Sequence, residues 1–183
     1  GRRLRRLIAE SAEPVKLRAT VAAETGVGVS DLVNAWLPGT DLAAEEIWVL
    51  GHLSEPGARD NASGCCLALE LARVLKQLTS DGTLPPLRRT VRFLHATEVS
   101  GFLPYLAAHQ ERFPQIVAGL CLDSVGQDFA KCGGEVVLDR SPEQNASFVD
   151  GLMETLLRAV AAVPVERFTT DNYATFPWHA EPF

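Results

Sequence analysis

Four polar residues follow predicted strands or begin a predicted helix, and their types suit a metal site. His52, Glu98 and Asp123 each come shortly after an apolar run, and Asp60 lies where a helix begins. Because ligands bind at the carboxyl ends of parallel strands, we expect these side chains to lie close together at one sheet edge. An imidazole with carboxylates is a ligand set for a divalent cation, with zinc the first choice. A carboxylate left off the metal could act as general base toward a metal-bound water.

Each of the four residues also has an ordinary structural explanation. His52 could be a hydrogen-bonded loop residue, and Asp60 could be the N-cap of the helix that follows it. Asp123, which precedes Ser124, could begin a turn, and Glu98 could point into solvent. Their common position at one sheet edge is what favours a metal site.

The strands and helices that would position these residues alternate along the chain. Patterns typical of strands occupy residues 15–23, 32–37, 47–50, 90–94, 116–122 and 135–138. Patterns typical of helices occupy residues 2–12, 67–78, 102–110 and 144–161. The alternation predicts an α/β fold, namely a three-layer α/β/α sandwich with a mixed, mostly parallel central sheet.

Each amphipathic helix should bury one apolar face. In the first helix the residues expected to turn inward are Leu4, Leu7 and Ile8. The most regular helix, which Asp60, Asn61 or Ser63 could cap, carries its apolar face at Leu67, Leu71, Val74, Leu75 and Leu78. The last helix places on one face Phe148, Leu152, Leu156 and Val160.

Composition excludes several classes of protein. The 183 residues include 17 basic and 23 acidic side chains, a formal charge of −6, so binding to a nucleic-acid backbone is not expected. No apolar run approaches the roughly 20 residues that cross a bilayer, so we expect no membrane partner. The sequence leaves the oligomeric state open.

The cysteines indicate reduced thiols in a cytoplasmic protein. They are Cys65, Cys66, Cys121 and Cys132, without CxxC spacing or a disulfide framework. A thiol enzyme is a rival hypothesis because Cys65 and Cys66 open a helix, whose dipole can lower a thiol pKa. A serine hydrolase is disfavoured because no Gly-x-Ser-x-Gly motif is present.

The sequence from His52 onward resembles that of a known protein family. The matching stretches, in chain order, are residues 51–53, 56–64, 67–78 and 89–94, then Glu98, Gly101 and Tyr105, then residues 122–126. They are similar to the co-catalytic zinc aminopeptidases of the bacterial leucyl aminopeptidase type, which have the zinc exopeptidase fold. The similarity is strongest to a branch of uncharacterised aminopeptidase-like proteins. It implies one aminopeptidase-like domain over residues 1–183, which we expect to be incomplete at its C-terminus.

The resemblance also implies roles for the four polar residues. His52 and Asp123 would bind one zinc ion, Asp60 would bridge two, and Glu98 would be the general base. The chain departs from the family in having Ser54 in place of an Asp and in having one Glu where the family has two adjacent ones. The last family ligand is a late histidine, for which His179 is the candidate.

The function that follows is a zinc-dependent, aminopeptidase-like hydrolase with one or two zinc ions. It would cleave an N-terminal peptide bond or a small amide through a metal-bound water. The alternative is a catalytically degenerate aminopeptidase-like fold that serves as a binding or assembly module. Zinc content distinguishes the two hypotheses.

Overall fold

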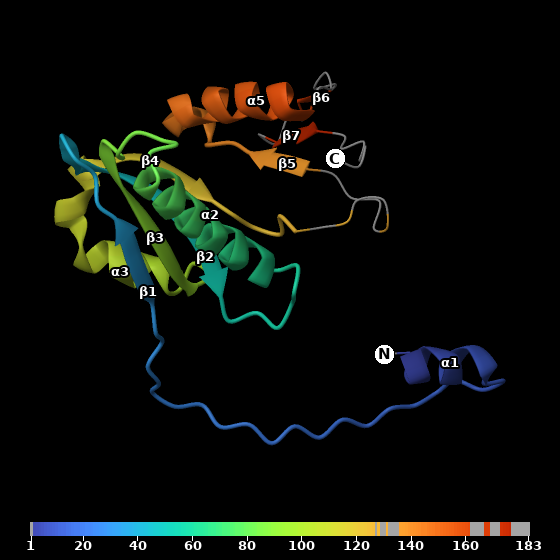
Figure 1. The fold of residues 1–183 in the computed structure, drawn as a ribbon. Coiled ribbons are helices and arrows are strands. Elements are labelled where there is room, and N and C mark those ends of the chain that lie inside the picture. Colours follow the sequence, from blue (N-terminus) through green and yellow to red (C-terminus); the bar gives the residue numbers. More distant parts are fainter. Residues whose placement is uncertain are drawn as a thin grey trace.

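A four-stranded mixed sheet forms the centre of the molecule (Figure 1). The computed structural model describes residues 2–126, 128, 131, 136–161, 167–168 and 173–176. The strands are β1 (Val33–Leu37), β2 (Leu42–Leu53), β3 (Arg89–Thr97) and β4 (Ile116–Cys121), in the order β1-β3-β2-β4. β2 runs parallel to both β3 and β4, whereas β1 pairs antiparallel with β3. The predicted mixed, mostly parallel sheet is therefore confirmed.

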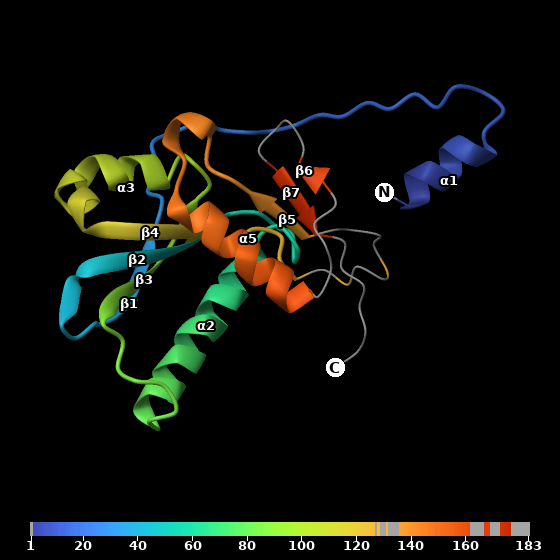
Figure 2. The same cartoon turned by 90° about the horizontal axis from the view of Figure 1, so that it is seen from above.

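Helices cover both faces of this sheet. Successive residues of a strand point to opposite faces, and β2 shows this at Trp48 and Val49. Val49 belongs to a core cluster with Ala68 of α2 (Ala62–Ser80), whereas Trp48 lies against Tyr105 of α3 (Phe102–Ala108), with ring centroids 6.2 Å apart. Figure 2 shows α2 and α3 on opposite sides of the strands. The 3₁₀ helix η1 (Gln110–Gln115) follows α3, and the result is the expected three-layer α/β/α arrangement.

The apolar core lies between α2 and the sheet. Its fully enclosed members are Val49, Ala68, Val91, Phe93 and Leu122. Most of the predicted apolar face of α2 is half-buried, and Leu71 packs against this cluster, but Leu67 is exposed. Ala68 takes the inward position instead, since it lets the helix approach the strands closely.

The N-terminal segment differs from the sequence-based expectation. α1 (Arg2–Glu10) forms as predicted, but it lies apart from the sheet in both views, and Leu7 and Ile8 are exposed (Figures 1 and 2). Residues 15–23 form no strand and run as extended chain. The alternating pattern is present there, but a strand also needs a neighbouring backbone to pair with, and none of the described strands pairs with this segment.

A second, three-stranded sheet follows the central one. It consists of β5 (Val136–Asp139), β6 (Arg167–Phe168) and β7 (Tyr173–Phe176), in the order β5-β7-β6. Between β5 and β6 lie η2 (Glu143–Asn145) and α5 (Phe148–Ala161). The predicted inward face of α5 is wrong for Phe148, Leu152 and Leu156, which are exposed, and the side chain of Val160 lies outside the described residues. Among the described residues, no helix is long and apolar enough to cross a membrane.

One buried ion pair joins the strands on the α3 side of the sheet. Arg92 donates to both oxygens of Glu46 at 2.6 and 2.7 Å, and each residue is 5% exposed. The Trp48 indole N–H also donates to Glu46 at 2.6 Å, and Arg112 lies 3.3 Å from the same carboxylate. The Arg92 guanidinium therefore holds the pKa of Glu46 below its usual value.

We expect Glu46→Leu to destabilise the protein by about 3–5 kcal/mol, because it leaves the Arg92 charge buried without a carboxylate partner. The double variant Glu46→Leu/Arg92→Met should recover much of this loss, since it removes both charges. Denaturant unfolding measures both values. The control is Asp41→Ala, which breaks the exposed pair with Arg88 and should cost less than about 1 kcal/mol. Equal losses in Glu46→Leu and Asp41→Ala would contradict the prediction.

Candidate metal site

Three strand ends and one helix start meet at a single edge of the central sheet. His52 is the next-to-last residue of β2, Asp123 lies two residues past β4, and Glu98 immediately follows β3. Asp60 directly precedes Asn61, the N-cap of α2. The parallel pairing of β2 with both neighbours sends all three strand ends to the same edge, as the sequence predicted.

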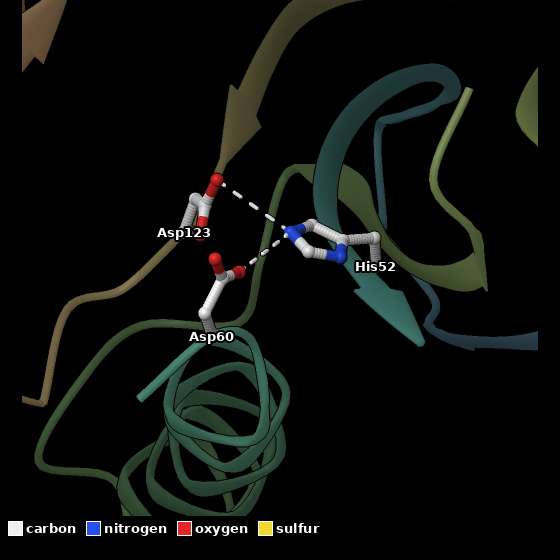
Figure 3. A group of neighbouring side chains, drawn as sticks. All are labelled: His52, Asp60 and Asp123. Carbon is white, nitrogen blue, oxygen red and sulfur yellow. Dashed lines mark ion pairs between the residues drawn. The ribbon is translucent and has the colours of Figure 1, made fainter. Parts of the chain in front are cut away.

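His52, Asp60 and Asp123 form a trio around one ring nitrogen (Figure 3). The Nε2 atom of His52 lies 3.4 Å from Oδ1 of Asp60 and 3.5 Å from Oδ2 of Asp123. His52 is 4% exposed, whereas both carboxylates are about half exposed. The imidazole is therefore buried inside the fold, whereas both carboxylates are partly open to solvent.

The donor set of the trio fits a divalent cation. Neither ring nitrogen of His52 has a hydrogen-bond partner among the described residues, although both are buried. Buried polar atoms in folded proteins nearly always have partners, so two unpartnered nitrogens on one ring require an explanation. A cation between Nε2 and the two carboxylates would provide a partner for that nitrogen and neutralise the acids.

A second group of possible ligands shares the same histidine. One ligand atom each from His52, Glu55 and Glu98 lie within 4.8 Å of one another. Glu98 was predicted to belong to the site, whereas Glu55 was not. Hydrogen bonding to the Asp60 carboxyl raises the pKa of Glu55, and burial and the nearby charges of Asp60 and Glu98 act in the same direction. The sequence signal for Glu55 is only its place three residues after His52 in a strand-to-helix loop.

Asn61 ties the two acidic segments together. It is 2% exposed, and its side-chain oxygen accepts from the backbone N–H of Gly64 at 3.0 Å and of Ser124 at 3.2 Å. Its amide donates to the carbonyl of Leu122 at 2.8 Å. One side chain therefore caps α2 directly after Asp60 and fixes the chain on both sides of Asp123.

Gly64 permits this close approach of helix and strand. A Cβ atom at this position would lie 2.1 Å from the Leu122 carbonyl oxygen and 2.4 Å from the side-chain oxygen of Asn61. Any larger residue would push the start of α2 away from the end of β4. The separation of Asp60 and Asp123 thus depends on a glycine at this point.

A pocket of about 210 Å³ adjoins the trio. The residues that line it are His52, Leu53, Ser54, Glu55, Asn61, Ala62, Cys65 and Cys66. Its wall is largely apolar away from His52 and Glu55, so a small apolar group could lie against it while a polar group faces the acids.

The thiol hypothesis finds no support at Cys65, one of the two cysteines on which it rests. Burial raises the pKa of the Cys65 thiol, and the thiol donates to the His52 carbonyl at 3.2 Å. Burial also raises the pKa of Cys121. A nucleophilic thiol needs a lowered pKa, so the environments of these two cysteines are those of structural residues. Cys132 and His179 lie outside the described residues, and the expected role of His179 as the last ligand stays a prediction.

Comparison with known sequences and structures identifies the family. The chain belongs to the family described as "Domain of unknown function (DUF4910)", whose model matches residues 25–176. No match was found among curated proteins.

A solved structure shares the fold. It is a Clostridium acetobutylicum protein described as a "putative peptidase", 22% identical, with a TM-score of 0.58. The match covers 70% of the present chain and 27% of the clostridial one, so the chain spans about a quarter of that protein's length.

We expect Asn61→Ala to displace Asp60 and Asp123 from His52 while the rest of the fold is retained. Loss of a buried cap with three hydrogen bonds should destabilise the protein by about 1–3 kcal/mol. It should also weaken Zn²⁺ binding by roughly tenfold or more, in the range seen when groups that orient metal ligands are removed. Calorimetric Zn²⁺ titration and thermal unfolding measure the two effects.

The matched control for Asn61→Ala is Ser63→Ala. Ser63 lies in the same helical turn, and its hydroxyl donates to the Arg59 carbonyl, a contact that does not reach the Asp123 segment. This variant should lower stability slightly and leave Zn²⁺ affinity unchanged. If both variants lose the same affinity, Asn61 has no special role in positioning the acids.

Proposed function

We propose that this protein is a divalent-metal-dependent hydrolase of the aminopeptidase type, with zinc as its first-choice metal. It would cleave an N-terminal peptide bond or a small amide. The observation that supports this most directly is the buried imidazole of His52, which lacks a hydrogen-bond partner in the described part of the chain and faces the carboxylates of Asp60 and Asp123. The shared fold with the clostridial protein adds support at the level of architecture.

In this proposal His52, Asp60 and Asp123 hold the cation. The bound cation would act as a Lewis acid toward the scissile carbonyl and toward water. Glu98 lies at the same sheet edge, within ligand-atom reach of His52, and would accept a proton from water and return it to the leaving amine. The apolar part of the adjoining pocket would receive a small side chain of the substrate.

The proposal predicts that Asp60→Ala abolishes metal binding, because it removes a carboxylate that faces His52 at 3.4 Å. Metal-stripped protein should be stabilised by added Zn²⁺, and the rise in melting temperature should disappear in this variant. Elemental analysis and thermal unfolding measure the effect. As a control, Asp31→Ala removes an exposed aspartate of the extended N-terminal segment and should leave the Zn²⁺ response intact.

Glu98→Gln should separate binding from turnover. The amide keeps the shape of the side chain but cannot take a proton, so we expect Zn²⁺ to bind while turnover of aminoacyl 4-nitroanilides falls by about 10²–10⁴-fold. Retained turnover would remove Glu98 from the reaction. If the wild-type protein neither binds Zn²⁺ nor hydrolyses any member of the substrate panel, the hydrolase proposal fails and the binding-module hypothesis is favoured.

A further inference from the structure

Four carboxylates surround one imidazole at the sheet edge, and basic side chains do not balance them. They are Asp60 and Asp123, which flank His52, and Glu55 and Glu98, which form the second group with it. Within the described part of the chain, none of the four forms an ion pair with a lysine or arginine. Such a concentration of like charge needs protons or cations to be stable.

Glu55 belongs to this cluster by position, because one of its carboxylate oxygens lies within 4.8 Å of a ring nitrogen of His52 and of a carboxylate oxygen of Glu98. Two ionised carboxylates at this distance repel each other. A divalent cation would offset this repulsion, because each carboxylate could offer it an oxygen. The buried His52 ring, with neither nitrogen partnered, supplies an independent indication of a ligand at the same place.

The geometry points to Glu55 as a cation ligand of this site beside His52, with Glu98 left to move a proton. This inference rests on the proposed function, and it adds a residue that the sequence did not indicate. Between His52 and Glu55 lies Ser54, whose φ of 80° places it in the left-handed region. His52 and Glu55, three residues apart, can therefore face the same centre.

Glu55→Gln tests the inference in the full chain with Zn²⁺ alone as the probe. Calorimetric titration of metal-stripped protein should show Zn²⁺ binding weakened by about tenfold or more. The metal-free variant should also melt at a higher temperature than metal-free wild type, because one like charge has been removed. The rise in melting temperature on adding Zn²⁺ should be smaller than in wild type. A merely structural role for Glu55 would lower the melting temperature of the metal-free protein instead.

Two further variants sharpen the test. Glu55→Asp keeps the charge but withdraws the carboxylate by one methylene, so it should weaken Zn²⁺ binding without raising the melting temperature of the metal-free protein. Glu24→Gln removes the same charge from the exposed N-terminal segment and should change neither quantity.

The outcomes separate this inference from the proposed function. If Glu55→Gln binds Zn²⁺ as tightly as wild type while Asp60→Ala does not bind it, Glu55 is not a ligand and the proposed function stands. If wild type binds no Zn²⁺, both are overturned. Weakened binding together with a higher melting temperature of the metal-free protein supports Glu55 as a ligand.

Discussion

The parallel pairing of β2 with both β3 and β4 is the constraint on which the candidate site depends. In this register His52 lies beside Ala96 of β3, and Leu50 lies beside Cys121 of β4. Glu98 and Asp123 each follow within two residues of these partners, so the three strands deliver their polar residues to one place. If the pairing of β2 with β3 or with β4 slipped by one residue, the side chains of the shifted strand would point to the opposite face of the sheet. The polar residue that this strand carries would then be separated from the other two.

The same strand carries two polar centres of opposite character. At Glu46 the buried carboxylate is met by Arg92, by the Trp48 indole and by Arg112, so the group is neutralised within the fold. Within the described residues, the imidazole of His52 has no hydrogen-bond partner, and the acids around it form no ion pair with a lysine or arginine. The carboxylate of the first centre is balanced by basic side chains without a ligand, and this centre serves stability. At the second centre the negative charges lack basic partners and the ring nitrogens lack hydrogen bonds within the described residues, as expected of a site that binds a cation.

The sequence predicted the parts of the fold that depend on local pattern and missed those that depend on distant partners. Strand ends at His52 and Asp123 could be anticipated because apolar runs stop there. The alternating pattern of residues 15–23 could not reveal that none of the described strands pairs with this segment. Glu55 was missed because no periodicity governs a loop, and its position depends on one backbone angle at Ser54. Asn61, one of three candidate caps, is the cap because it accepts from the Gly64 N–H, and no local pattern could reveal its contacts with Leu122 and Ser124.

The backbone beside each candidate residue indicates what these loops are built for. Ser54, Val99 and Ser124 have φ angles of 80°, 51° and 52°, and they follow His52, Glu98 and Asp123 by one or two residues. Left-handed conformations of residues other than glycine cost about 1–3 kcal/mol each, and a β-branched valine is especially unfavourable there. Hydrogen bonds such as that of Asn61 to the Ser124 N–H help to hold these angles. A fold that needed these loops only as connections would gain stability from ordinary angles. Three unfavourable backbone conformations at one sheet edge are therefore best explained by the positions they impose on the imidazole and the carboxylates.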